Sequence, residues 1–384
     1  MRRVALIIET SIAYGRGLLA GISKYNRLHG SWLIYFHPRG FGDPLPTWLK
    51  GWKGDGMLAG IGWSCPADLL ASYDVPVINL RARTDPRFPS VWADNVQVAE
   101  LAAQHLLERG LKSFGYCGKG ISGHHWFDTR GDAFRNAVER VGATCHMFTL
   151  DPDQVRGTIP SDETGLEEWI RSLPKPVGVL ACNDVRGLQV LEACRRCGAH
   201  VPDEVAVIGV DNDDPLCELA IPPMSSVDLN ATQIGYEAAA LLERMMDGEK
   251  PSSNLLEISP RGVVTRQSTD VLASEDTAVN SAARYIREHA CSSSLRVDDV
   301  LAHVPLSRPL LQERMKRILG RTIHQEIVRV RIESAKRLLL LPGVPIKEVA
   351  RRTGFSNVQH FTNTFHATVR ETPAQFRARR TVSD

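Results

Sequence analysis

The fold of the last quarter of the chain follows from the stretch Gly354-Phe355-Ser356-Asn357-Val358-Gln359-His360-Phe361-Thr362-Asn363-Thr364-Phe365-His366. Gly354 is predicted to end one helix, because glycine adopts positive φ without a Cβ clash. Ser356 is predicted to cap the next helix, on which Val358, Phe361 and Phe365 form an apolar edge. The preceding run 346–352 is amphipathic. A short helix, a glycine turn and a polar helix with an aromatic edge predict a helix-turn-helix.

A second helix-turn-helix is predicted upstream, from Leu301 through Gly320. There Ser307 is expected to cap a helix over 308–319 that Gly320 ends, and a long helix over 326–341 follows. Together with the closing Thr372-Pro373-Ala374-Gln375-Phe376-Arg377, this region resembles the AraC/XylS family of bacterial regulators over residues 278–380. The resemblance implies two DNA-reading helices joined by the long one. An ordinary helical hairpin is the alternative.

The charge of the chain is unevenly distributed. Residues 281–384 hold 19 of the 46 Lys and Arg residues but 9 of the 44 Asp and Glu residues, a net charge of +10. The rest of the chain carries a net charge of −8, so the overall +2 conceals the asymmetry. A basic segment attached to an acidic body predicts a domain that binds a polyanion, whereas a solvated helix face would not by itself concentrate the excess there.

The composition limits the classes of protein to which the chain can belong. A chain of 384 residues with 43% hydrophobic and 23% charged residues predicts two or three globular domains. Its eight scattered cysteines do not form a disulfide framework, and Cys194-Arg195-Arg196-Cys197 has no second ligand pair for zinc, so reduced, packed thiols are expected. The apolar run 4–8 is too short for a signal peptide, and no segment approaches the roughly 18 residues of a membrane span. We expect a cytoplasmic protein with no membrane partner.

Strands and helices alternate through the first two thirds of the chain. Strands are predicted at 4–8, 32–36, 57–60, 76–80 and 90–93, and a second series at 113–117, 145–150, 177–181 and 205–210. Helices are predicted around 14–25, 96–107, 132–141, 164–173 and 185–197. Alternation of this kind indicates parallel sheets. The fold class expected is therefore a two-lobed α/β domain followed by an all-α domain with two helix-turn-helix motifs.

Short motifs in this region resemble the sugar-binding domain of LacI/GalR repressors, a periplasmic-binding-protein fold. They are spread over residues 4–269 and comprise 91–95, 130–134, 180–184, 201–211 and 266–269. Repressors of that family carry a DNA-binding headpiece before this domain, whereas here Met1 opens almost directly into the first strand. We therefore expect a sensing domain over 1–270, a linker over 271–280 and a DNA-binding domain over 281–384. This domain order resembles that of bacterial xylose regulators.

The expected ligand site lies outside the carboxyl ends of the parallel strands. A sugar site needs rigid hydrogen-bonding groups and an aromatic face. The LacI/GalR resemblance implies sugar contacts from Asp94, Arg130, Asn183 and Asp211, although these could instead cap helices or tie loops. Further candidate ligand contacts are a stacking platform and three residues of the first lobe: Trp126, Glu9, Tyr14 and Arg16.

Exposed residues early in each predicted reading helix are expected to meet base edges in the major groove. They are Arg308, Gln312, Asn357, Gln359, His360 and Asn363. The cations that follow in the first reading helix, Arg314 and Lys316, are expected to contact phosphate, which positions the protein without specifying sequence.

Two rival functions remain open beside the regulator. Gly118-Lys119-Gly120-Ile121-Ser122-Gly123 matches a dinucleotide-binding loop, which would make the chain an NAD-dependent oxidoreductase. That motif needs a helix that begins inside it, whereas residues 124–128 are predicted to continue as a loop. The other rival is a DNA-binding protein indifferent to small molecules.

The sequence favours a sugar-responsive transcription factor. The resemblances imply an activator of sugar catabolism whose effector is a small sugar, with D-xylose first. The partners expected are double-stranded DNA, RNA polymerase and a second copy in a homodimer. Neither a cofactor nor a bound metal is expected, and no catalytic constellation points to an enzyme.

Overall fold

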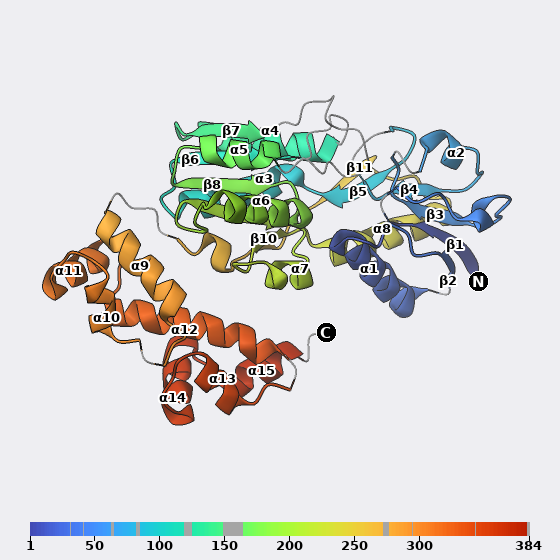
Figure 1. The fold of residues 1–384 in the computed structure, drawn as a ribbon. Helices are drawn as coiled ribbons and strands as arrows, with labels where there is room; N and C mark the ends of the chain where they lie inside the picture. Colours follow the sequence, from blue (N-terminus) through green and yellow to red (C-terminus); the bar gives the residue numbers. More distant parts are fainter. Residues whose placement is uncertain are drawn as a thin grey trace. The chain divides into compact units, whose positions relative to one another are not determined.

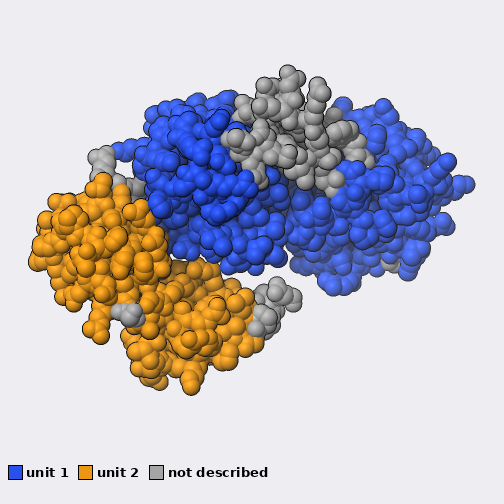
Figure 2. Space-filling model, in the orientation of Figure 1, with its two compact units in different colours: residues 1–271 blue, residues 272–384 orange. Residues whose placement is uncertain are grey.

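The computed structural model describes residues 1–30, 32–40, 42–62, 65–81, 85–118, 125–148, 164–271, 276–293, 295–341 and 343–381. The chain divides into an N-terminal unit, Met1–Val271, and a C-terminal unit, Leu272–Asp384, which are coloured separately in Figure 2. Within the described residues, no helix combines the length and apolar character that a bilayer crossing requires.

The first lobe of the N-terminal unit is a six-stranded sheet in the order β11-β5-β4-β3-β1-β2, with every pairing parallel. Its strands are β1 (Arg2–Ile7), β2 (Trp32–Phe36), β3 (Gly56–Ala59), β4 (Val77–Asn79), β5 (Ser90–Ala93) and β11 (Leu255–Ile258), accompanied by α1 (Ala13–His29), η1 (Thr47–Leu49), α2 (Ala67–Ala71) and α8 (Ala231–Met246). Helices α1 and α8 lie side by side (Figure 1). They approach so closely that a Cβ on Gly235 would lie 2.2 Å from the carbonyl oxygen of Leu18.

The second lobe is another six-stranded sheet, in the order β12-β10-β9-β8-β6-β7, in which only the edge strand β12 is antiparallel among the described pairings. Its strands are β6 (Ser113–Cys117), β7 (Thr144–Phe148), β8 (Val177–Ala181), β9 (Val205–Val210), β10 (Ser225–Asp228) and β12 (Gly262–Val264). Its helices are α3 (Asn95–Leu107), α4 (His125–Glu139), α5 (Thr164–Ser172), α6 (Asp184–Cys197), α7 (Asp214–Leu219) and η3 (Gln267–Thr269).

The chain passes between the lobes after β5, after β10 and after β11, as Figure 1 allows the reader to follow. Strands β8 and β9 are buried throughout and carry the continuous apolar runs that predicted them. The predicted two-lobed α/β architecture is confirmed. The elements from α7 to β12 were not predicted, although two of the three crossings lie among them.

Helix α4 begins earlier than predicted. The sequence suggested a loop up to 128 and a helix from 132, whereas α4 starts at His125. Tertiary contacts account for the difference, because the Tyr116 hydroxyl donates a 2.7 Å hydrogen bond to the carbonyl of Phe127 and Arg130 is buried against the neighbouring helix α3. The predicted late start of this helix was an argument against a dinucleotide-binding loop at 118–123, and that predicted start was wrong. Residues 119–123 of the loop lie outside the described residues.

A buried polar network holds the end of the N-terminal unit. His105 Nε2 and Thr269 Oγ1 share a hydrogen bond of 2.8 Å, and Thr269 Oγ1 also bonds Ser225 Oγ at 2.7 Å. Arg109 donates to the carbonyls of Thr269 and His105 at 2.6 and 2.7 Å. Because buried polar groups are costly unless paired, these bonds fix the turn at 267–269 against α3 and β10.

Lowering the pH from 7 to 5 should destabilise the N-terminal unit through His105. Burial, reinforced by the charge of Arg109, lowers the pKa of His105 to about 3. Below a pH of about 6.5 the unfolded chain binds a proton that the folded state does not accept. The stability that His105 contributes is therefore full above that pH and declines toward pH 3, by about 1.4 kcal/mol per pH unit. Buried Asp184, whose pKa is raised to about 7 by loss of solvent, contributes an opposite slope, so the effect of His105 appears as a difference between variants. Thermal unfolding of the wild type and of His105→Gln between pH 7 and 5 should differ by this slope, and identical slopes would contradict the assignment.

The C-terminal unit is all-helical. It comprises α9 (Thr277–His289), α10 (Val297–Ala302), α11 (Arg308–Leu319), α12 (Ile323–Leu340), α13 (Ile346–Arg352), α14 (Val358–Val369) and α15 (Pro373–Thr381). One core gathers side chains from α9 to the first half of α12, and a second gathers those from the rest of α12 to α15. Helix α12 thus joins two helix-turn-helix modules (Figure 1), as predicted.

The observed helix ends in this unit differ from the prediction in three details. Asp276 caps α9 by accepting from the amides of Ala278 and Val279, so this helix begins inside the segment expected to be linker. Asn357, and not Ser356, caps α14 through the amide of His360. Ser307 precedes α11 without a side-chain capping bond. Gly354 has φ of 77°, as the glycine turn requires.

Candidate functional site

Arg130, the central ligand candidate, is a buried residue of α4 with its guanidinium at the carboxyl edge of the second sheet. Its Nε and Nη2 donate to Asn95 Oδ1 at 3.1 and 2.6 Å, and its Nη1 donates to the carbonyl of Cys182. In the described part of the chain, no carboxylate lies within ion-pair distance of this guanidinium. A buried cation bonded only to neutral groups is suited to a further acceptor, because hydrogen bonds compensate the loss of water only in part.

Asn183 and Asp211 follow the neighbouring strands β8 and β9. Asn183 is buried and caps α6, since its Oδ1 accepts from the amide of Arg186 at 2.9 Å. Its amide nitrogen is the part of the side chain that can donate to a ligand. Asp211 is half-buried and has φ of 111°, a left-handed conformation rare outside glycine. Strain of this kind is typical of functional sites, where surrounding contacts must maintain it.

Tyr14, on the first turn of α1, faces the same region from the first lobe. Its hydroxyl donates to the carbonyl of Leu80 at 3.0 Å. Burial raises the pKa of this hydroxyl, Asp211 adds to the rise, and Arg81 and Arg130 oppose it. The charges of Asp211 and Arg130 in the second lobe thus both influence the pKa of Tyr14 in the first.

Three of the remaining ligand candidates have structural partners. Asp94 caps α3 by accepting from the amides of Val96 and Gln97. Glu9 is buried in an ion pair with Arg81. Arg16 donates to Asp213 Oδ2 at 2.7 Å, an ion pair that joins α1 of the first lobe to the loop after β9 in the second. The side chain of Trp126 lies outside the described residues.

Sequence reasoning missed two residues of this region, Arg81 and Asp213. Arg81 follows the predicted strand 76–80, and Asp213 lies two residues beyond Asp211. The rule that sites form at the carboxyl ends of strands could have found both. That rule could not have predicted which side chains each of them pairs with.

The predicted reading helices are α11 and α14. Arg308, Gln312 and Lys316 on α11 are exposed, as are Asn357, Gln359, His360 and Asn363 at the start of α14. Several candidates are partly engaged within the unit. Arg314 donates to Asp276 Oδ2 at 3.1 Å, and Asn357 uses its side-chain oxygen as the cap of α14. Arg308 lies 3.7 Å from Asp298 Oδ1, and Gln359 donates to Asn363 Oδ1 at 3.0 Å. The aromatic residues of α14, Phe361 and Phe365, face the core, which leaves its polar side for a partner.

Comparisons with known proteins agree with both halves of this description. The N-terminal unit matches the periplasmic binding protein-like domain over residues 103–269, and the C-terminal unit matches a helix-turn-helix domain over residues 300–379. The xylose operon regulatory protein of Escherichia coli strain K12 is 31% identical over 98% of this chain and 96% of its own length. Its counterpart from Haemophilus influenzae is also 31% identical, over 98% of each.

Solved structures extend the likeness to the fold. The structure of the xylose-binding transcription activator xylR covers 98% of both chains with a TM-score of 0.78 at 30% identity. The regulator CelR in complex with cellobiose covers 69% of this chain and 84% of its own, with a TM-score of 0.55 at 22% identity, which shows the fold alone. The chain therefore belongs to the family of the xylose operon regulatory proteins, in which a periplasmic-binding-protein-like domain precedes an AraC-type helix-turn-helix domain.

Proposed function

We propose that this protein is a transcription factor that binds D-xylose or a related sugar between the lobes of its N-terminal unit and double-stranded DNA through its C-terminal unit. The observation that carries the proposal is the buried guanidinium of Arg130, which lacks a carboxylate partner among the described residues and binds the carbonyl of Cys182, next to Asn183 in the sequence. Donors and acceptors arranged in this way complement adjacent sugar hydroxyls. Family relatives named for xylose make that pentose the first candidate.

The proposed response is a change in the balance between two states. A sugar that bridges Asp211 and Arg130 to the first lobe near Tyr14 binds a closed arrangement of the lobes more tightly than an open one. Only such differential affinity can shift the equilibrium between them. We propose that the closed state alters how two protomers of a homodimer present α11 and α14 to major grooves about 34 Å apart. In this proposal the protein activates transcription through RNA polymerase, in the cytoplasm where bacterial DNA resides.

A thermal-shift panel of pentoses and hexoses tests the sensing half directly. D-Xylose at 1000 times its dissociation constant should stabilise the N-terminal unit by about 4 kcal/mol, because a ligand that binds only the folded state raises its melting temperature. Asp211→Asn, which keeps the size and replaces the charged acceptor, should weaken that shift. If no sugar at millimolar concentration moves the melting temperature, the sensing function is wrong.

Charge removal on α11 tests the DNA-binding half. Lys316→Ala should weaken binding to all duplexes alike and reduce the slope of log affinity against log salt by about 1, because one phosphate contact is lost. Asn363→Ala on α14 should instead cost about 1–3 kcal/mol on the preferred sequence alone. Fluorescence anisotropy with duplexes that the protein selects from a random pool measures both. Lys336, which pairs with Glu333 on the connecting helix α12, is the matched control. An equal effect of Lys336→Ala would argue against a role for α11.

A further inference from the structure

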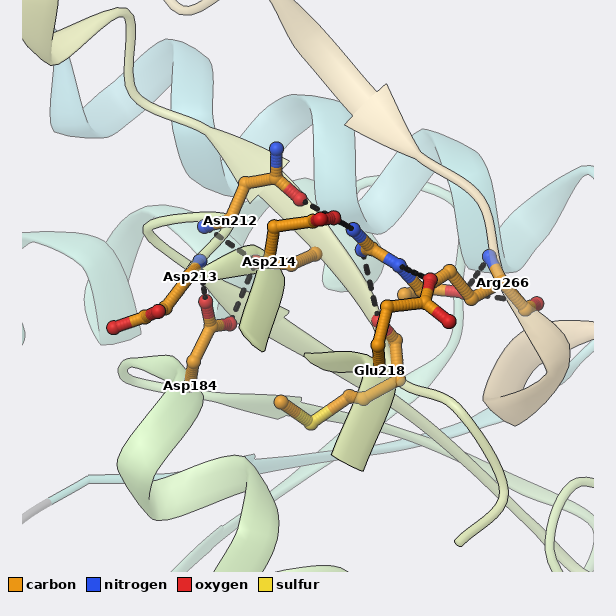
Figure 3. Close-up of polar contacts among 9 residues, drawn as sticks. Asp184, Asn212, Asp213, Asp214, Glu218 and Arg266 are labelled. Atoms are coloured by element: carbon orange, nitrogen blue, oxygen red, sulfur yellow. Dashed lines mark hydrogen bonds and ion pairs between the residues drawn. The ribbon is translucent and has the colours of Figure 1, made fainter. Parts of the chain in front are cut away.

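Arg266 is the most heavily hydrogen-bonded buried cation of the N-terminal unit among the described residues. Its Nη2 donates to Asn212 Oδ1 and Asp214 Oδ1 at 3.0 and 2.6 Å, and its Nε donates to Glu218 Oε1 at 2.8 Å. Its Nη1 donates to the carbonyl of Met224 at 3.1 Å. Figure 3 shows Asn212, Asp214 and Glu218 around the guanidinium. One side chain thus ties together the loop after β9, helix α7 and the start of β10.

The loop that Arg266 holds is the β9–α7 loop, residues 211–213. Both Asp211 and Asn212 have positive φ, 111° and 50°. Other supports of this loop include hydrogen bonds of 3.0 Å from the Asp211 amide to the Val227 carbonyl, of 3.0 Å from the Asn212 amide to Ser226 Oγ and of 2.7 Å from the Asp213 amide to Asp184 Oδ2. A strained backbone persists only where its surroundings over-determine it, so the position of the Asp211 carboxylate depends on these contacts.

The same loop meets the opposite lobe. Asp213, between the two residues whose side chains Arg266 binds, accepts from Arg16 of α1 at 2.7 Å. Arg16 is itself anchored, since its Nη1 donates to the carbonyls of Thr10 and Ser11 at 3.1 and 3.0 Å. A movement of one lobe relative to the other therefore pulls on the β9–α7 loop directly.

Arg266 also stands where the N-terminal unit ends. It precedes η3, and the unit ends at Val271, from which the chain continues into the C-terminal unit. Its own backbone is fixed, because its amide donates to Ser225 Oγ at 2.8 Å and its carbonyl accepts from the same hydroxyl. The guanidinium thus reaches the ligand loop while its backbone begins the exit segment, residues 266–271.

We propose that Arg266 is a positioning residue that couples closure of the two lobes to the exit segment leading to the DNA-binding unit. The inference rests on the proposed sugar-responsive function and names the residue through which the response passes. The position of the β9–α7 loop is fixed by the sugar that Asp211 binds and by the Arg16–Asp213 ion pair between the lobes. Arg266 transmits the position of that loop to η3. Loss of Arg266 separates sugar binding from its effect on DNA.

The test compares two quantities in the full-length protein: the dissociation constant for D-xylose, and the ratio of DNA affinities with and without saturating D-xylose. The DNA probe is a duplex that the wild-type protein selects from a random pool. In the wild type the ratio should differ from 1 by at least about fivefold. Arg266→Gln should bring it to within about twofold of 1 while D-xylose still saturates the protein. Asp214→Asn with Glu218→Gln removes two surface charges from the cluster and should give an intermediate ratio in a well-folded protein.

Arg109→Gln is the matched control, because Arg109 also binds the exit segment, at the Thr269 carbonyl, but its hydrogen bonds among the described residues go to Thr269 and His105 and not to the β9–α7 loop. Its coupling ratio should remain that of the wild type even if its melting temperature falls. Equal loss of coupling in the Arg109 and Arg266 variants would reduce Arg266 to a structural role and overturn the inference alone, as would wild-type coupling in Arg266→Gln. A wild type that binds no sugar would overturn the inference and the proposed function together.

Discussion

Arg130→Met should weaken D-xylose binding by about 100-fold while DNA binding in the absence of sugar survives. Methionine fills a similar volume but removes every donor of the buried guanidinium. A hydrogen bond to a charged group contributes about 1.5–3 kcal/mol, and 3 kcal/mol corresponds to a factor of about 150 in affinity. Isothermal titration calorimetry measures the loss. The melting temperature should fall as well, because Asn95 Oδ1 and the Cys182 carbonyl lose their donor.

Two further variants separate the ligand role of Arg130 from its structural one. Arg130→Lys keeps the positive charge but loses the planar guanidinium. Its affinity for D-xylose should be intermediate, since an ammonium cannot bridge two acceptors as a guanidinium does. Arg135→Met alters an exposed arginine on the same helix, which pairs only with Asp132 among the described contacts, and should leave both sugar affinity and stability unchanged. Wild-type affinity in Arg130→Met would refute the placement of the sugar beside α4.

Phe365→Ala should unfold or loosen the second helix-turn-helix and abolish specific DNA binding while sugar binding is retained. Phe365 is completely buried, with its ring centroid 5.6 Å from that of Phe361 and 5.4 Å from that of Phe376. Removing a buried phenylalanine costs about 3–5 kcal/mol through lost burial and the cavity left behind. That is a large part of the stability of a small helical domain.

Urea unfolding and DNA anisotropy check this expectation, and the sugar-induced thermal shift supplies the internal control. The N-terminal unit has its own core, so the shift with D-xylose should persist in Phe365→Ala. His366→Ala changes the next residue of α14, which is exposed, and should cost less than about 0.5 kcal/mol. A Phe365→Ala protein that still selects the wild-type DNA sequence would show that α14 is not needed for reading.

Local patterns predicted much of the fold, and they erred where tertiary contacts override local preference. The strands 32–36, 90–93, 113–117, 177–181 and 205–210 were predicted to the residue, because a buried parallel strand needs a continuous apolar run. The start of α4 was wrong because His125 to Gly131 are modest helix formers whose helix is held by Tyr116 and by the burial of Arg130. Asn357 displaced Ser356 as a cap by one residue, a shift that propensity cannot resolve since both are good caps.

The candidate site, like the fold, was predicted in part from local sequence and in part decided by tertiary contacts. Its residues could be proposed from their places after strands and from resemblance, because topology brings the carboxyl ends of parallel strands to one edge. Whether a given polar group is available to a ligand could not be proposed. Glu9, Arg16 and Asp94 are each engaged by a protein partner, and only the fold shows those partners.

By itself, the sequence determined the alternation of strands and helices, the two glycine-turn helix pairs and the basic charge of the last quarter. Each is a property of residues close in the chain, where periodicity, capping and composition act. The tertiary structure decided which charged side chains pair within the protein and which can bind a ligand. Arg130 donates to Asn95, 35 residues away in the sequence, and Arg16 donates to Asp213, 197 residues away. Pairings at such separations depend on how helices and strands pack within and between the lobes, because the electrostatic and hydrogen-bonding energy of a group is set by its neighbours in space.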